Sequence, residues 1–203
     1  MLKIINDSIE NHIDDHEVIL VGTNQNCSMA QGFQRFVMLN YPHVQKVNEG
    51  TNYGDTRKFG LTMHVDPQED SPEFCICYMY RHNTRPDLTK DTVVYRALEE
   101  CLEHVAAFYA GRNVGTTLMG ASKYEGNGDR DKILEMFHKV FDNESINLTV
   151  YDYTQKSRSE TMKEVREREL EVKEENIREY YRMVSRRKEM AEERFRKNGH
   201  VRY

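Results

Sequence analysis

The feature that most constrains the fold is the stretch Val18–Pro42, where an apolar run leads into a polar turn and then an amphipathic segment. Val18 to Val21 are apolar and precede Gly22, which is typical of a short buried strand. Thr23 to Ser28 have the Asn and Ser content of a turn. A helix with Met29, Gly32 and Phe33 at its start is predicted from apolar residues at three-and-four spacing, which are Phe33, Phe36, Val37 and Tyr41. Pro42 ends this pattern, and the order of strand, loop and helix N-terminus favours a ligand site at the loop.

Strands and helices alternate along the rest of the chain. Apolar or alternating patterns predict strands at Leu2–Ile5, Phe59–Val65, Phe74–Tyr80, Val114–Met119 and Ile146–Tyr151. Amphipathic patterns predict helices over about residues 91–110 and over Asp129–Phe141. A polar region follows Pro42 up to Asp55. The alternation predicts an α/β fold with roughly five or six strands.

Charge divides the chain into two parts. The 203 residues carry a net charge of −5, but residues 1–155 hold 14 basic and 23 acidic side chains, and residues 156–203 hold 15 and 11. The first part therefore has a net charge of −9 and the second of +4. We predict a folded domain at 1–154 and a charged extension at 155–203. The negative total argues against non-specific nucleic-acid binding by the whole chain.

Cysteine usage and hydropathy favour a soluble protein in a reducing cytoplasm. Cys27, Cys75, Cys77 and Cys101 form no C-x-x-C pair, and no apolar signal segment is present. No run of about 18 apolar residues predicts a membrane span. Cys75 and Cys77 alternate in a predicted strand, where small buried hydrophobic side chains fit. We expect no membrane, metal or cofactor.

The C-terminal extension is predicted to be one long helix. No Pro or Gly occurs from Ser157 to Lys197, and Glu, Lys and Arg dominate the composition. A narrow apolar stripe recurs every seven residues at Leu170, Ile177, Val184 and Ala191. Lys173 and Arg187 occupy the second heptad position, so a coiled coil is weakly indicated. Three roles stay open: packing on its own domain, self-association, and contact with a protein partner or nucleic acid.

Two further features are typical of ligand sites. Asp7 follows the predicted strand Leu2–Ile5 at the end where open α/β sheets place ligand groups, although it can instead cap the next turn with Ser8. A second loop carries Gly120, Gly126 and Gly128 between a strand and a helix. Glycines let the backbone approach a ligand closely and present several N–H groups, which suits a diphosphate.

Three motifs resemble those of the macro domains. They are Met29-Ala30-Gln31-Gly32-Phe33 before a helix ending in Tyr41-Pro42, Leu118-Met119-Gly120-Ala121 through Gly126-Asn127-Gly128, and Ile146 to Tyr153. The branch that the sequence resembles contains the terminal ADP-ribose glycohydrolases, the yeast-type ADP-ribose-1″-phosphate phosphatases and the antitoxin macro domains, and it includes phage-encoded members. The resemblance covers residues 1 to about 154.

The resemblance implies a three-layer α/β sandwich with a mixed central sheet, followed here by the charged C-terminal helix. It also implies that the domain binds ADP-ribose or a derivative, with Asp7 on the adenine amino group and the two loops around the distal ribose and diphosphate. We assign to this site Asp7, Asn24, Asn26, Met29, Gln31, Gly32, Phe33, Gly120, Ala121, Ser122, Gly126, Asn127, Gly128, Tyr151 and Tyr153. Asn24 and Asn26 can hydrogen-bond the ribose or an attacking water, or can shape the turn.

The sequence departs from the family pattern within both loops. Ala30 replaces the family's first Gly, Gln34 replaces its usual Ala, and the second loop is a few residues longer. The glycohydrolase branch uses a Lys after the strand that matches Phe74–Tyr80, but this chain has Arg81-His82-Asn83 there. That branch's catalytic Asp, in the second loop, falls near Glu125 or Gly126 in this chain. We therefore do not expect a covalent Lys mechanism.

His82 and Glu125 are the predicted catalytic residues, because they are the titratable groups beside the two loops and hydrolysis at the distal ribose needs an acid or base. His82 can instead be a loop histidine that faces solvent. Three functions stay open: hydrolysis at the distal ribose, as an ADP-ribose-1″-phosphate phosphatase or by de-ADP-ribosylation; non-catalytic binding or sequestering of ADP-ribose or a cyclic nucleotide; and a scaffold for the long helix. We favour the hydrolase.

The expected partners follow from these functions. They are ADP-ribose or a derivative, and a second copy or a protein partner for the C-terminal helix. Nucleic acid is expected only as an ADP-ribosylated substrate. The expected location is the cytoplasm, which is the host cytoplasm if the chain is phage-encoded.

Overall fold

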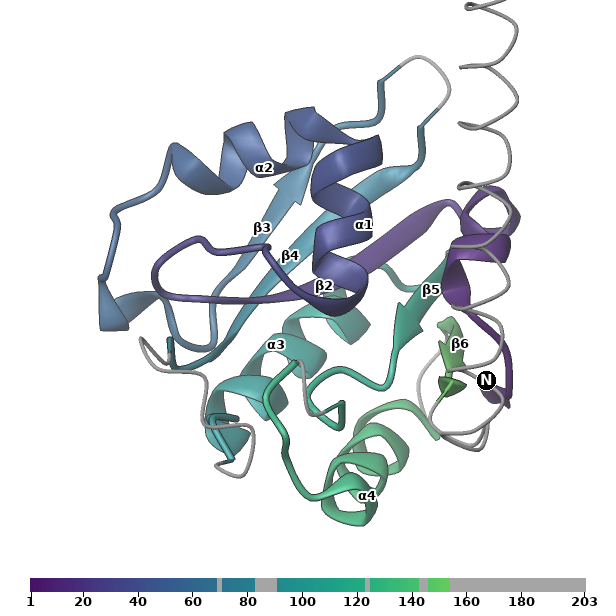
Figure 1. Cartoon of the computed structure of the whole chain (residues 1–203). Coiled ribbons are helices and arrows are strands. Elements are labelled where there is room, and N and C mark those ends of the chain that lie inside the picture. The colour runs from purple at the N-terminus through teal and green to yellow at the C-terminus, as the bar shows by residue number, and fades with distance from the viewer. Residues whose placement is uncertain (69–70, 83–90, 123–124, 143–145, 154–203) are drawn as a thin grey trace, which may run out of the picture. The chain divides into compact units, whose positions relative to one another are not determined.

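A six-stranded sheet forms the centre of the domain (Figure 1). The structure is a computed structural model that describes residues 1–68, 71–82, 91–122, 125–142 and 146–153. Within them the strand order is β1-β6-β5-β2-β4-β3. The predicted domain boundary at residue 154 and the predicted C-terminal helix lie outside the described residues.

The sheet is mixed, because five strands are parallel and β3 runs antiparallel to β4. The strands β2 and β4 are almost completely buried, which explains their continuous apolar sequences. The bounds are β1 Leu2–Ile5, β2 Val18–Asn24, β3 Thr62–Val65, β4 Glu73–Tyr80, β5 Asn113–Thr117 and β6 Asn147–Tyr151. The predicted α/β class with a mixed sheet is confirmed.

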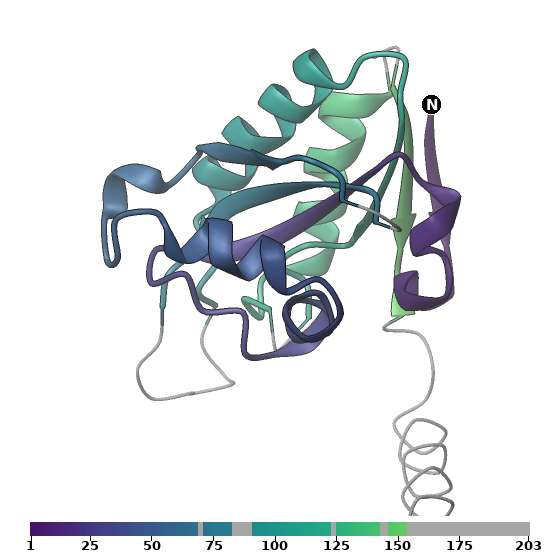
Figure 2. The ribbon, with the colours of Figure 1, turned by 90° about the horizontal axis from the view of Figure 1, so that it is seen from above.

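Helices cover both faces of the sheet, which gives three layers (Figure 2). The helices α1 and α2 lie on one face and α3 and α4 on the other, and each face has its own apolar core. The helical bounds are η1 Ile9–Asn11, η2 Ile13–Asp15, α1 Gly32–Asn40, α2 Pro42–Glu49, η3 Thr56–Lys58, α3 Tyr95–Phe108 and α4 Arg130–Phe141. No helix in the described ranges is long and apolar enough to cross a membrane.

The two cores hold the loops in place. Leu98 and Leu102 of α3 and Ile133 and Phe137 of α4 are fully buried in the larger cluster. On the other face, Phe33, Val37 and Val44 from α1 and α2 belong to a second cluster. Since α1 and α4 each follow a loop at the same edge of the sheet, their packing fixes where those loops lie.

Three local predictions differ from the structure. Met29 precedes α1, which begins at Gly32. Pro42 begins α2 in the region that the sequence marked only as polar, because proline at the first position lacks an N–H that the helix does not use. The strand predicted from Phe59 starts only at Thr62, since Phe59 follows the short helix η3.

Candidate functional site

The carboxyl ends of the five parallel strands bring the predicted site residues to one edge of the sheet. Asp7 follows β1, the β2–α1 loop (residues 25–31) follows β2, and His82 follows β4. The β5–α4 loop (residues 118–129) carries the second glycine motif, and Tyr151 ends β6. Ligands of open α/β sheets bind at this edge, so the topology supports the location that the sequence predicted.

Glu125 of the β5–α4 loop lies at the N-terminus of α1. Its Oε1 accepts hydrogen bonds from the backbone N–H groups of Phe33 at 2.6 Å and Gln34 at 3.4 Å. Gln31, at the position that precedes the helix, makes no side-chain capping bond. A carboxylate at a helix N-terminus is stabilised by the free N–H groups and the helix dipole. Glu125 is therefore the cap of α1, and it joins the two predicted loops directly.

Gly32 makes this contact possible. Its φ of +54° favours glycine, and a Cβ at this position would lie 2.4 Å from the Glu125 Oε1 and 2.8 Å from its Cδ. Gly32 is one of the residues that the sequence predicts at the ligand site. In the structure the group that approaches it is the Glu125 carboxylate, a pairing across 92 residues of sequence that no local pattern indicates.

The environment of Glu125 suits acid–base chemistry. The side chain is 6% exposed, and no described Lys, Arg or His pairs with it. Burial raises the pKa of Glu125 to about 7, although the hydrogen bonds from Phe33 and Gln34 lower it, and the charge of Glu10 raises it further. A carboxyl group that titrates near neutrality can both accept and donate a proton.

The β5–α4 loop is folded tightly upon itself. The N–H groups of Glu125 and Asn127 both donate to the Ser122 carbonyl at 2.9 Å, and that of Gly128 donates to Gly120 at 2.8 Å. Ala121 donates to Leu118 at 3.1 Å. The N–H groups of these four donors, which include the predicted ligand-binding residues Ala121, Asn127 and Gly128, are thus paired within the loop. Asn127, with a φ of 53°, and Gly126, with a φ of 112°, supply the turn.

At the end of β2, Asn24 shapes the turn of the β2–α1 loop. Its Oδ1 accepts from the N–H groups of Asn26 at 3.0 Å and Ser28 at 3.2 Å, and its Nδ2 donates to the Ser28 carbonyl at 3.1 Å. Asn26 donates to the Tyr53 hydroxyl at 3.2 Å. Met29 is 1% exposed and belongs to the core beneath the loop. Of the two roles left open for Asn24, turn formation is the one that these contacts display.

A buried lysine holds the other side of this loop. Lys58 is 7% exposed, and its Nζ lies 3.1 Å from the Cys27 Sγ and 3.0 Å from the Thr51 Oγ1. The ammonium also lies 4.7 Å from the centre of the Tyr78 ring. Cys27 has a φ of 57°, and Asn48 donates to its carbonyl at 3.0 Å. Lys58 was not predicted as a site residue. The polar residues that precede it in the sequence give no indication that its side chain is buried.

Comparison with solved structures places the fold among known proteins. No protein-family model matches the sequence, and no curated protein does. A protein of unknown function from Bacteroides thetaiotaomicron is 16% identical, with a TM-score of 0.62 over 75% of this chain and 98% of that one. The macrodomain of Mycobacterium tuberculosis DarG is 14% identical, with a TM-score of 0.58 over 74% and 97%. Thermosipho africanus DarTG, solved in complex with ADP-ribose, is 12% identical, with a TM-score of 0.61 over 76% and 42%.

The chain has the macro domain fold. The fold that the three sequence motifs implied is thereby confirmed, whereas the branch and a phage origin stay predictions.

At the β1 end of the macro domain, Asp7 is paired with a histidine. Its Oδ1 accepts from the Ser8 N–H at 2.7 Å, and its Oδ2 lies 3.1 Å from the His12 Nε2. His12 also contacts Asp15 at 2.8 Å through Nδ1, and its ring stacks on Tyr151 with centroids 5.0 Å apart. The bond with His12 lowers the pKa of Asp7, and the bonds with Asp15 and Asp7 raise the pKa of His12. The sequence analysis gave His12 no role.

The stacked imidazole of His12 limits the part of the Tyr151 ring that a ligand can contact. Tyr151 is 4% exposed, and its hydroxyl lies 2.8 Å from the His16 Nε2. Burial lowers the pKa of His16 and raises the pKa of Tyr151. His12 therefore lies between Tyr151 and solvent, while Tyr153 beyond the strand is partly exposed.

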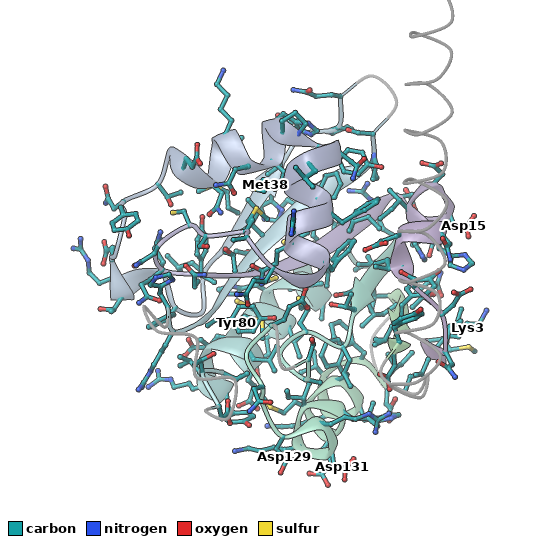
Figure 3. All side chains as sticks on the ribbon, in the orientation of Figure 1. Lys3, Asp15, Met38, Tyr80, Asp129 and Asp131 are labelled. Carbon is teal, nitrogen blue, oxygen red and sulfur yellow. The ribbon has the colours of Figure 1, made fainter. Side chains whose placement is uncertain are left out.

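Tyr80, labelled in Figure 3, ends β4 beneath the two loops. It is 4% exposed, and its hydroxyl has no hydrogen-bond partner among the described residues. The ring lies over Gly22, where a Cβ would be 2.5 Å from the hydroxyl oxygen. Burial, and then the charge of Glu125, raise the pKa of Tyr80. The backbone of Gly120 faces this hydroxyl closely enough to lower the pKa of Tyr80 in part, so the hydroxyl is enclosed by the β5–α4 loop.

His82 follows β4 beside the β2–α1 loop. Its backbone N–H donates to the Gln25 Oε1 at 2.9 Å, and its side chain is partly exposed. No hydrogen bond or ion pair joins its imidazole to another described residue. The structure thus brings His82 to the predicted edge without linking it to Glu125, and the catalytic role of both residues stays a prediction.

Proposed function

We propose that the macro domain binds ADP-ribose, or an ADP-ribosyl group, along the edge formed by the carboxyl ends of its parallel strands. The observation that carries the proposal is that the N-terminal N–H groups of α1 bind an anion in this structure, namely the Glu125 carboxylate. Helix N-termini bind phosphate in the same way and need no Lys or Arg, so a domain with a net charge of −9 can hold a diphosphate. DarTG, which has a similar fold, was solved with ADP-ribose.

The adenine end of the ligand is assigned to Asp7. Its carboxylate lies at the end of β1. The Oδ2 atom can accept a hydrogen bond from an amino group once its contact with the His12 Nε2 is broken. The ring of Tyr153, which is partly exposed, is proposed to stack on the base.

The reaction that we propose is hydrolysis at the distal ribose, with Glu125 as the general acid or base. A buried carboxyl group with a pKa of about 7 is suited to this task, because it can exchange a proton near neutral pH. His82 is proposed as the second titratable group, brought beside the loops by the end of β4. No Lys follows β4 at the matching position, so the reaction does not use a Lys nucleophile.

Calorimetry with ADP-ribose tests the binding proposal. We expect saturable binding by wild type, weakened in Asp7→Asn because the amide presents one acceptor fewer to the adenine amino group. Ribose 5-phosphate, which lacks adenine, should bind equally weakly to both proteins. An absence of heat with ADP-ribose at about millimolar concentration, close to the weak limit of specific binding, would contradict the proposal.

Turnover assays separate a hydrolase from a binding module. The protein is incubated with ADP-ribose-1″-phosphate and with ADP-ribosylated protein or DNA, and the released product is followed. Glu125→Gln should slow release by about 10²–10⁴-fold, the range for loss of a general acid or base. If wild type turns over and a Glu125→Gln, His82→Ala double variant is as fast, the active-site assignment is wrong. If wild type binds but does not turn over, the domain is a non-catalytic reader.

A further inference from the structure

The Glu125 carboxylate occupies the place that the proposed function gives to the ligand's diphosphate. Its Oε1 accepts from two N–H groups of the first turn of α1, those of Phe33 at 2.6 Å and Gln34 at 3.4 Å. A phosphate oxygen bound to the same N–H groups would have to lie where this oxygen lies, within van der Waals contact of Gly32. The carboxylate and the phosphate therefore cannot both occupy the helix N-terminus.

Charge makes the two groups competitors as well. The groups that act on Glu125 are the N–H groups of Phe33 and Gln34 from α1 and the Glu10 side chain from η1, and Glu125 in turn acts on the Tyr80 side chain from β4. Neither side chain in this set is a cation, and Glu10 adds a second negative charge. Because the carboxylate is 6% exposed, solvent screens little of its repulsion with an arriving diphosphate.

The glycines that follow Glu125 are packed closely against the core. A Cβ on Gly126 would lie 2.7 Å from a Val93 methyl, and one on Gly128 would lie 2.8 Å from the same methyl and 2.9 Å from Ile133. The loop is thus packed against the core immediately after Glu125. The group that can leave α1 is the side chain, by rotation about its own bonds.

We propose that Glu125 is a built-in competitor of the ligand, which caps α1 in the free domain, is displaced by the diphosphate, and takes up one proton from solvent as it leaves. The inference rests on the proposed ADP-ribose binding. Displacement also turns the neutral carboxyl group away from the helix and toward the ligand, so the acid of the proposed reaction becomes available only in the complex.

The proton uptake predicts how affinity depends on pH. Below about pH 7 the carboxyl group is already neutral, and binding needs no further proton. Above that value one proton must be bound, so the dissociation constant should rise by up to about tenfold per pH unit. ADP-ribose itself does not titrate there, since its diphosphate has no weakly acidic group. His12 beside Asp7 also titrates. Its contribution to the pH dependence of the affinity is the part that remains in a Glu125 variant.

Calorimetry with ADP-ribose at about pH 6, 7 and 8, in buffers of different ionisation enthalpy, measures affinity and proton uptake together. Wild type should take up close to one proton at about pH 8, whereas Glu125→Gln should take up almost none and bind about tenfold tighter there. At about pH 6 the two proteins should bind alike. Glu135→Gln, which changes an exposed carboxylate on α4, is the matched control and should behave as wild type.

A second measurement needs no variant. The amide NMR signal of Phe33 should titrate with a midpoint near pH 7 in the free protein, and added ADP-ribose should remove that titration, because Glu125 no longer contacts the amide. If ADP-ribose binds with the same affinity and no proton uptake in wild type and Glu125→Gln, the competitor role is wrong and the proposed function stands. If neither protein binds ADP-ribose at any pH, both proposals fail.

Discussion

The helices α1 and α4 both follow a loop at the same edge of the sheet, but their first turns are capped in different ways. Asp129 directly precedes α4, and its Oδ1 accepts from the N–H groups of Asp131 and Lys132 at 3.1 Å each. Asp129 and Asp131 are exposed, and Figure 3 labels both. The first turn of α1 instead binds Glu125, which is buried and comes from the other loop.

The difference separates a structural cap from a displaceable one. The Asp129 cap is local, so its carboxylate reaches the N–H groups with little loss of conformational freedom, and water solvates its charge. The Glu125 cap connects two loops and holds a charge in a buried place, which raises its pKa to about 7. Of the two, only α1 has an N-terminus whose occupant is destabilised at neutral pH. That end of the site is therefore the one that an external anion can take.

The largest effect expected from this comparison is the change in the free energy of unfolding that Glu125→Gln causes. The pKa of Glu125 rises from its ordinary value of 4.5 to about 7 in the folded protein, so the folded state favours the neutral form. The stability that this neutral form provides is complete below about pH 4.5 and is lost as the pH rises to about 7. At about pH 8, Glu125→Gln should raise the free energy of unfolding by up to about 3 kcal/mol, and at about pH 4.5 by close to zero.

Urea unfolding at these pH values measures the effect. Glu135→Gln, on the exposed face of α4, should change the free energy of unfolding by less than about 0.5 kcal/mol at each pH. If Glu125→Gln destabilises the protein equally at all pH values, then the carboxylate is an ordinary cap like Asp129, and the contrast between the two helices is lost.

The next effect is the loss of stability expected from Gly32→Ala, compared with the loss expected from Gly111→Ala. Both have a positive φ, +54° and +81°, but a Cβ on Gly111 meets nothing within 4 Å, whereas one on Gly32 would strike the Glu125 carboxylate. Gly111→Ala should therefore lose about 1–2 kcal/mol from the backbone alone. Gly32→Ala should lose about 1–2 kcal/mol more, since it also breaks the α1 cap.

A double-variant cycle sharpens this test. In a Glu125→Ala background the carboxylate is gone, so Gly32→Ala should destabilise the protein no more than Gly111→Ala does. Unfolding free energies of the single and double variants give the coupling. A Gly32→Ala effect that is unchanged in the Glu125→Ala background would mean that the close approach is unimportant for stability.

Local sequence patterns predicted the elements that local physics decides. The apolar runs located β2 and β4, because strands buried on both faces must be apolar throughout, and Asp129 marked the start of α4. Pro42 was misleading because a proline that ends one helix can also begin the next. The thin apolar content of α2, with Val44 and Asn48 as its buried residues, gave little periodicity to detect.

The site was predicted less completely, because its contacts join residues that are distant in sequence. The sequence analysis placed Glu125 and Gly32 near one ligand, but nothing local indicates that they contact each other or that Glu125 caps α1. The pairing of Asp7 with His12 and the burial of Lys58 beside Cys27 depend equally on the folded arrangement. Residue types at loop positions predicted where the site lies, but the partners of its charges came only from the structure.

The smallest effect is expected from Asp129→Ala, which removes the local cap of α4. Loss of the two capping bonds at α4 should lower the free energy of unfolding by about 1 kcal/mol, as for other N-caps. The affinity for ADP-ribose should not change, because water can solvate the exposed N–H groups of Asp131 and Lys132, and neither is assigned to the ligand. Urea unfolding and calorimetry on the same variant check both halves. A loss of ADP-ribose affinity in Asp129→Ala would show that α4 also takes part in binding the anion, so α1 would no longer be distinguished as the phosphate end of the site.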